Sequence, residues 1–281
     1  MKKNILSVLV LFAIIPLSGF AQLSKIDVQK GQKYKVETTT KLATSADVMG
    51  QTMENNTDSK STTVYEILNV GPEEIKLESI ITKMLVNASM MGQNMTFDSD
   101  KKDNEGPMAD VLSKMINKAK GIKLDNKGTI TKQDATEDAG QGTMMVTGAS
   151  GNETATELFI PALVGKNLKA GDSFTDIGTI KKEKFSSADS GTYKITAIEN
   201  GIASISYSGT QVLSIVMEQM GMEMTSNSNN MVKSELQVDI KTGLVLAKAS
   251  VVESVVSIDA GGMTIPATGK TITTINISPL K

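Results

Sequence analysis

The chain has 281 residues with 31 acidic and 29 basic side chains, so its formal net charge is −2 at pH 7, and every basic residue is lysine. A charge this close to zero gives no electrostatic footprint for nucleic acid or for an anionic membrane surface. The chain contains no cysteine, histidine or tryptophan, which excludes disulfides, thiol and histidine-based nucleophiles, and the commonest metal ligand.

The first 21 residues have the pattern of a cleaved export signal. Lys2 and Lys3 precede an apolar run from 5 to 17, which is too short for a permanent membrane helix of about 20 residues. Small residues at 19 and 21 suit signal-peptidase cleavage before Gln22. We therefore expect an extracytoplasmic protein, in the periplasm or secreted, with no transmembrane span after removal of the signal.

Five short blocks recur in the same order in the two halves of the chain. Block 31–34 matches 171–174, 65–70 matches 193–198, 75–77 matches 203–205, 91–99 matches 220–228, and 124–128 resembles 238–243. This order predicts two copies of one β unit, at 22–132 and 158–281, which pack as one fold. The segment 133–157 between them is poor in large apolar residues and is interpreted as a linker or mobile loop.

Alternating apolar and polar residues indicate strands in both copies. Residues 33–42 and 235–240 alternate with a period of two and are rich in Thr, Val and Ile, which suit a pleated surface. Gly-Pro at 71–72 and Asn-Gly at 200–201 supply turns. The predicted fold class is mainly β: a duplicated antiparallel meander with long hairpins, forming a curved sheet, half-barrel or sandwich.

One amphipathic helix is predicted at about 107–120. Its apolar residues Met108, Val111, Leu112, Met115, Ile116 and Ala119 follow helical spacing. Pro107 suits the first turn and Gly121 suits the C-terminal stop. We expect this helix to cover an apolar cavity of the curved sheet. The segments 81–91 and 210–220 fit either a strand or a helix, and both alternatives stay open.

Methionine stands beside glycine at the predicted hairpin bends. Met-Gly-x-x-Met occurs at 49–53, 91–95 and 220–224, and Gly-Gly-Met occurs at 261–263. If the strands run up and down, all four segments fall at the same end of the sheet and form a flexible apolar rim. The candidate ligand-binding residues are Met49, Met53, Met91, Met95, Met220, Met222, Met224 and Met263. Adaptable thioethers suit a lipid, another apolar ligand or an envelope protein partner.

Two other interpretations of these methionines stay open. Thioethers are soft ligands that suit Cu(I), which would make the chain a periplasmic copper-binding protein. Methionine also fills irregular space where long hairpins bend, which would make the chain a purely structural envelope component. The ligand-binding interpretation requires no metal and no cofactor.

Fragments of enzyme motifs do not assemble into a catalytic site. Ser99–Lys102 and Lys241–Gly243 echo the penicillin-interacting serine enzymes, but no Ser-Asp-Asn stands between them. Gly269–Thr271 resembles the end of a phosphate loop, yet Thr264 occupies the position of its first glycine, which argues against a nucleotide site. The acidic stretch 98–105 lacks the central glycine of a calcium loop. We therefore expect a non-catalytic protein without catalytic residues.

The segment 158–174 carries a family resemblance. Its Leu-Phe-Ile-Pro, followed by Val164 and Gly-Asp-Ser-Phe at 171–174, resembles a signature of uncharacterised exported proteins of Bacteroidetes-type bacteria with a duplicated β-rich unit. The leader and the turn at 239–243 are similar, although Phe174 stands where that pattern commonly has tryptophan. The resemblance implies an envelope location and a β fold, and it implies no activity.

Overall fold

The computed structural model describes residues 21–48, 50–90, 92–134, 156–219 and 222–280. Twelve strands form one antiparallel sheet, which confirms the predicted fold class. These strands are β2 (Lys33–Val48), β3 (Gln51–Val70), β4 (Glu74–Met90), β5 (Gln93–Asp98), β6 (Ala119–Asp125), β7 (Ile130–Gln133), β9 (Ser173–Lys182), β10 (Phe185–Glu199), β11 (Ile202–Gln219), β12 (Met222–Asp239), β13 (Val245–Ala260) and β14 (Met263–Leu280).

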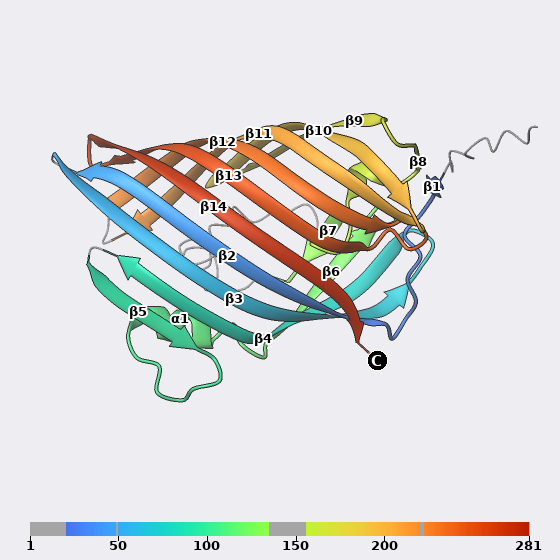
Figure 1. Ribbon diagram of the computed structural model, residues 1–281. Coiled ribbons are helices and arrows are strands. Elements are labelled where there is room, and N and C mark those ends of the chain that lie inside the picture. Colours follow the sequence, from blue (N-terminus) through green and yellow to red (C-terminus); the bar gives the residue numbers. More distant parts are fainter. Residues whose placement is uncertain (1–20, 49, 91, 135–155, 220–221, 281) are drawn as a thin grey trace, which may run out of the picture.

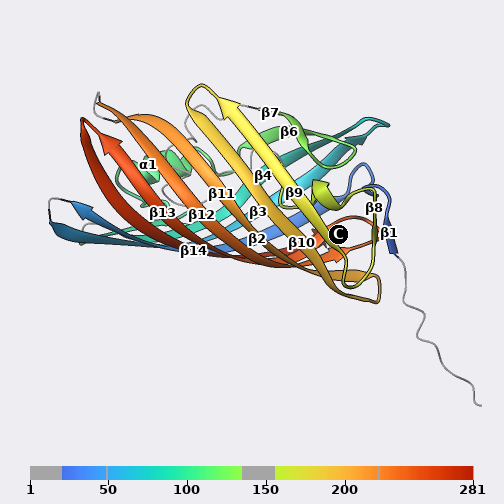
Figure 2. The same cartoon turned by 90° about the horizontal axis from the view of Figure 1, so that it is seen from above.

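The sheet is a meander whose first and last long strands meet at its centre. Its pairing order is β7-β6-β4-β3-β2-β14-β13-β12-β11-β10-β9, and β5 pairs with β4 outside this path. The pairing of β2 with β14 therefore joins the two halves of the chain. Within the described residues β7 and β9 stay at opposite ends of this order, and the curved sheet is open (Figures 1 and 2).

Four smaller elements complete the described fold. Strand β1 (Ala21–Leu23) pairs with β8 (Lys166–Leu168) in a separate two-stranded sheet. A 3-10 helix, η1, spans Pro161–Leu163, and the α-helix α1 spans Pro107–Ser113. In the part of the chain that the structure describes, neither helix is long and apolar enough to cross a membrane.

The main hydrophobic core lies at one end of the sheet's inner face, which we call the core end. Alternation along each strand places apolar side chains such as Val36, Ile205 and Val238 on this face, where at most 1% of their surface is exposed. Residues 23–28 and 158–168 pack against them. The inner face is defined below as the face that carries this core, and the outer face is the opposite one.

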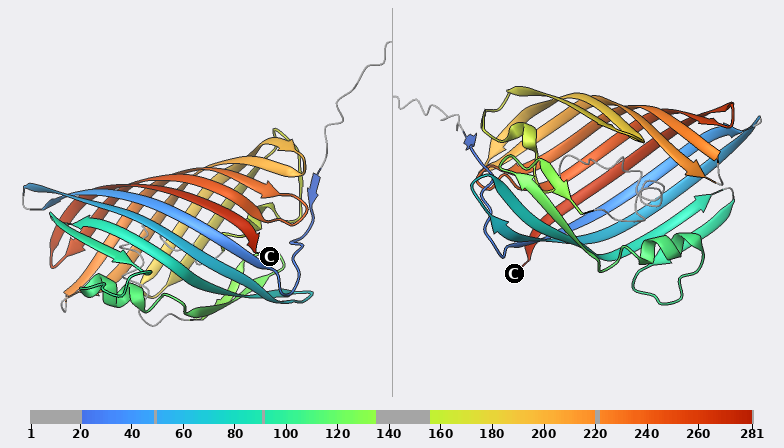
Figure 3. Two further views of the ribbon diagram at one scale, coloured as in Figure 1. Left: turned by 60° about the horizontal axis from the view of Figure 1, so that its bottom comes forward. Right: turned by 180° about the vertical axis from the view of Figure 1, so that it is seen from behind.

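A second cluster holds α1 against the sheet. Ala109 and Leu112 of α1 pack with Met84, Val86 and Phe97 of β4 and β5, and Figure 3 shows the helix beside these strands. This short helix replaces the predicted one at 107–120, whose second half is wrong.

The helix ends early because the following residues join the sheet. Asn117 has a φ of 57°, a left-handed conformation that an α-helix cannot continue through. Residues 119–125 then pair with β4 as β6, and their alternation buries Ile122 and Leu124. Pairing with β4 satisfies backbone hydrogen bonds and covers two apolar side chains, which an exposed last helical turn would not do.

The two segments that the sequence left as either strand or helix are strands throughout their described residues. Residues 81–90 belong to β4 and residues 210–219 belong to β11. The predicted linker at 133–157 and the predicted leader lie mostly outside the described residues, which omit 1–20 and 135–155.

The backbone makes the same hydrogen bonds at positions that the sequence repeat pairs. Gly31 and Gly171 both have positive φ, and their N–H groups donate to the carbonyl oxygens of Ile67 and Ile195. In the second half β12 pairs with β11 along its whole length, whereas in the first half β5 and β6 pair with successive parts of β4. The single strand β12 thus corresponds to β5 and β6 together. Helix α1 lies between β5 and β6 in the chain and interrupts this strand in the first half.

Candidate functional site

The strands that flank the predicted methionine bends meet at the end of the sheet opposite the core end. The β2–β3, β4–β5, β11–β12 and β13–β14 connections share this end, because their strands alternate in direction within one antiparallel order. We call it the hairpin end; it is on the left in Figure 1.

The candidate methionines whose side chains are described share the inner face. Cross-strand partners lie on the same face of a sheet. Met263 pairs with Ala260 and Ala260 with Met224, and these positions alternate in step with the buried core residues. Met53 and Met95 reach the same face through their own partners on β2 and β4.

These four methionines are spread across the sheet. They stand on β3, β5, β12 and β14, and neighbouring members are two strands apart, which is about 10 Å at the usual strand spacing. Such spacing suits a broad rim better than a copper site, whose thioethers must converge on one ion. Met49, Met91 and Met220 lie outside the described residues, as does the side chain of Met222 at the start of β12.

Sequence reasoning missed the other apolar side chains between these methionines. Together they form a surface that we call the apolar zone: Val48, Met53, Ile215, Met224, Val256, Ile258, Met263 and Ile265. In the described structure all are at least partly exposed, Met263 by 55%, and none belongs to either core cluster. The fold thus leaves an apolar inner surface away from its core.

A row of polar residues, interrupted by one glycine, crosses the inner face between the core and the apolar zone. Each member pairs with the next one across neighbouring strands from β10 to β3. We call it the polar row: Asp189, Gln211, Asn230, Ser254, Gly269, Thr44 and Asn55. The inner face is therefore banded, with an apolar core, a polar row and a partly exposed apolar zone.

Hydrogen bonds fix the orientation of the amides in the polar row. The Asp189 carboxylate accepts from Ser187 Oγ at 2.8 Å and from Gln211 Nε2 at 2.6 Å. Because a carboxylate only accepts, the Gln211 amide must turn its oxygen away, and that oxygen accepts from Asn230 Nδ2 at 3.0 Å. The series ends at Asn230 Oδ1, which has no hydrogen-bond partner in the described structure although Asn230 is only 6% exposed.

Acidic groups gather beside this end of the polar row. Asp176 on β9 pairs with Gly191, and Asp189 pairs with Gly178, so the two carboxylates lie diagonally on one face. Burial, and secondarily the charge of Asp189, raise the pKa of Asp176. No ion pair joins either aspartate to a lysine within the described residues.

Two tyrosines lie between these carboxylates and the core. The rings of Tyr193 and Tyr207 are 4.6 Å apart between centroids. Burial, and then the charge of Asp176, raise the pKa of both phenols. The region is thus rich in hydrogen-bond acceptors and negative charge, with aromatic faces beside it.

A separate set of ionisable residues, Tyr65, Glu157 and Lys248, lies at the core end. Tyr65 donates to Glu157 Oε2 at 2.5 Å, and burial lowers the pKa of the Lys248 ammonium while Glu157 opposes this shift. No set of three acidic, cysteine or histidine side chains that would hold a metal ion occurs among the described residues.

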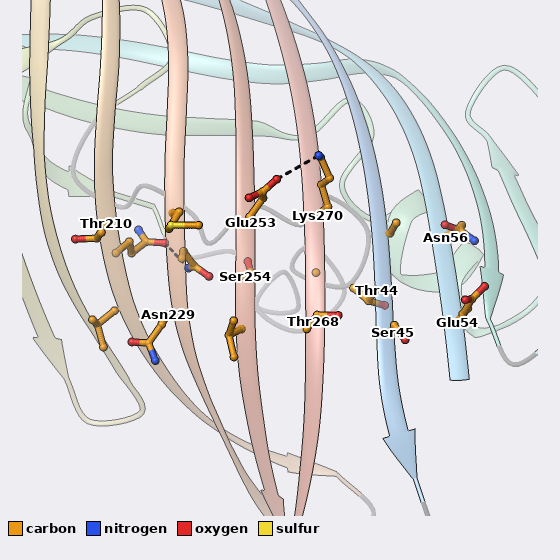
Figure 4. Close-up of a pocket in the computed structure, with 17 residues that line it drawn as sticks. Thr44, Ser45, Glu54, Asn56, Thr210, Asn229, Glu253, Ser254, Thr268 and Lys270 are labelled. Atoms are coloured by element: carbon orange, nitrogen blue, oxygen red, sulfur yellow. Dashed lines mark hydrogen bonds and ion pairs between the residues drawn. The ribbon is translucent and has the colours of Figure 1, made fainter. Parts of the chain in front are cut away.

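The outer face carries a groove of about 770 Å³. Its lining includes the exposed side chains of Val212, Met231 and Val255. Glu253 and Lys270 form an ion pair of 3.2 Å across β13 and β14 within it (Figure 4). Its lining also includes five members of the polar row, Thr44, Gln211, Asn230, Ser254 and Gly269, which alternate with the outer-face residues along the strands and belong to the inner face.

A family model covers part of the chain. The model of a family of unknown function, DUF6263, matches residues 72–159. The chain matches no curated protein.

Solved structures with weak similarity include an outer membrane channel and the β domain of an autotransporter. An outer membrane channel from Pseudomonas putida F1 is 7% identical over 90% of this chain and 97% of that chain, with a TM-score of 0.26. OccK7 (OpdD) from Pseudomonas aeruginosa is 5% identical over 90% and 100% of the two chains, with a TM-score of 0.25. The β domain of the Bordetella autotransporter Brka is 6% identical over 88% and 99%, with a TM-score of 0.22. TM-scores this low carry no functional argument.

Proposed function

We propose that this chain is a non-catalytic protein of the cell envelope that binds an apolar or amphipathic ligand on the inner face of its hairpin end. The observation that carries the proposal is the apolar zone. Its side chains face inward, as core residues do, yet they remain partly exposed and lie outside both core clusters of the described structure.

An apolar ligand would bind the apolar zone because burying apolar surface lowers the free energy. Each methylene that a ligand transfers from water to such a surface contributes about 0.8 kcal/mol. A tail of about ten methylenes therefore offers roughly 8 kcal/mol before the costs of ordering the ligand and the rim. Unbranched methionines at the rim adapt to tails of different shape.

The envelope location rests on the sequence. The first 21 residues have the pattern of an export signal. The chain also has no cysteine, so an oxidising compartment poses no problem for its folding.

The first experiment examines what the protein carries. The full chain is expressed with its leader, and the mature protein is purified from the periplasmic fraction without detergent. Native mass spectrometry followed by solvent extraction should show bound apolar mass. A clean unliganded species in every preparation, together with no binding in the dye experiment below, contradicts the proposal.

The second experiment compares two adjacent valines on opposite faces. Val256 lies in the apolar zone, whereas Val255 is 64% exposed on the outer face. The probe is N-phenylnaphthylamine, a neutral dye that fluoresces in apolar surroundings. Val256→Asn should weaken dye binding about fivefold or more, because it places an amide on the apolar surface, and Val255→Asn should leave it unchanged. Equal effects of the two substitutions would place the dye elsewhere.

A further inference from the structure

We propose that the β10–β12 end of the polar row, with Asp176 of β9, is a subsite for the ammonium head group of an amphipathic ligand whose tail lies on the apolar zone. This inference rests on the proposed function and adds the chemistry of the head group.

The hydrogen bonds favour a ligand that donates. Asn230 Oδ1 is a buried acceptor without a partner in the described structure, and leaving such an atom unsatisfied costs about 1–3 kcal/mol. Rotation of the amide does not resolve this, because it would set Asn230 Oδ1 against the Gln211 oxygen that now accepts from Asn230 Nδ2. A donor from outside the chain satisfies the atom without disturbing the series.

The charges favour a cation. Asp176 and Asp189 face the same side of β9 and β10, and no lysine pairs with either of them in the described residues. An ammonium group carries one positive charge and three N–H donors, so it meets both requirements at once. The ring of Tyr207, which lies over Gly191 and Gly209 beside the polar row, also favours a cation.

The distance suits one molecule that occupies both surfaces. Asn230 and Met224 are six residues apart on β12, which is about 20 Å along a strand. Val256 and Ile258 face the interval between them from the neighbouring strand. A long hydrocarbon chain anchored at the polar row would therefore reach the methionine rim.

The test uses three probes with the same tail and different heads: dodecylammonium, dodecyltrimethylammonium and dodecyl sulfate. Binding to the mature protein is measured by calorimetry below the critical micelle concentrations. We expect dodecylammonium to bind at least tenfold more tightly than dodecyl sulfate and several-fold more tightly than the trimethyl probe, which has a charge but no donors. Preference for the sulfate, or equal binding of all three, overturns the head-group inference.

Variants locate the subsite. Asn230→Ala and Asp189→Asn should each reduce the ammonium preference at least fivefold. Asn229→Ala, at the adjacent outer-face position, and Asp58→Asn, which removes one exposed outer-face charge, should leave it unchanged. A preference that survives both inner-face substitutions overturns the assignment. If no dodecyl probe binds at all, the proposed function itself fails, and that outcome is distinct from binding without head-group preference.

Discussion

At the scale of single residues, the position of Tyr207 depends on two glycines. Gly191 and Gly209 pair across β10 and β11 on the inner face, and the Tyr207 side chain lies over both of them. A methyl group added at Gly209 would lie 2.5 Å from Tyr207 Oη and 2.7 Å from the backbone oxygen of Ser190. Only glycine therefore allows the ring to extend from the core toward the polar row.

This packing predicts that Gly209→Ala lowers the free energy of unfolding by about 1–3 kcal/mol, because backbone atoms as well as the ring must shift. Gly178→Ala is the matched control, since a methyl group there would approach Asp189 Oδ2 no closer than 3.8 Å. Urea unfolding followed by circular dichroism provides the comparison. Equal midpoints for the two variants would mean that Tyr207 does not occupy this position in solution.

The polar row illustrates what a single sequence does not reveal. Its members come from seven strands and are spread over positions 44 to 269 of the sequence. Each member is a single position in a strand that also holds other Ser, Thr or Asn residues. Only the cross-strand register aligns them, and register depends on the length of every hairpin. The methionine bends were easier to find, because each is a local motif and the alternating direction of the strands places all of them at one end.

At the scale of elements, alternation was a reliable guide and helical spacing was not. The stretches 33–42 and 235–240 lie in strands as predicted. The helix was predicted too long because Met115 and Ile116 continue the helical spacing while packing against the same cluster from outside the helix. Residues 119–125 then pair with the part of β4 that β5 leaves free. The local sequence pattern gives no sign of this tertiary contact.

The short helix should depend on its packing for stability. With seven residues and no side-chain cap, α1 is far below the length at which an isolated helix is stable. Leu112 is 1% exposed against Phe97 and Val86. We expect Leu112→Ala to lower the free energy of unfolding by about 2–4 kcal/mol.

The neighbouring exposed position provides the control for this prediction. Ser113→Ala should change the free energy of unfolding by less than about 0.5 kcal/mol. Hydrogen exchange of the α1 and β5 amides would show where the loss occurs. An unchanged urea midpoint for Leu112→Ala would mean that α1 does not pack on β4 and β5 in solution.

At the scale of the whole molecule, the core end and the hairpin end of the sheet have different roles. The core end supplies the stability, since the main buried cluster and the segments 23–28 and 158–168 gather there. The hairpin end carries little of the main buried core, which leaves its inner face available to a ligand. The sequence indicated the apolar rim through its methionines, but the separation of core from rim follows from where the chain places residues 158–168, which no periodicity specifies.

All four tyrosines of the chain share one property that is testable on the intact protein. Burial is the largest cause that raises the pKa of Tyr34, Tyr65, Tyr193 and Tyr207 above the usual 10.0, and neighbouring carboxylates add to it. Because the chain has no tryptophan, the tyrosinate absorbance of the protein reports these groups alone. Native protein should therefore ionise its tyrosines at higher pH than protein unfolded in urea.

The same shifts determine how stability changes in alkali. Above about pH 10 the unfolded chain loses its phenolic protons while the folded chain retains them, so the folded state binds more protons and its stability falls as pH rises. Lys248 acts in the opposite direction, because its lowered pKa makes the folded state release a proton first, but it is one group against four. We expect the urea midpoint to fall steadily as pH rises past about 10, and Tyr65→Phe to reduce that fall, since Tyr65 is the phenol with both deep burial and a carboxylate partner. Coincident absorbance titrations of native and urea-unfolded protein would show that the phenols are exposed in solution, and the packing of the core end around them would then be wrong.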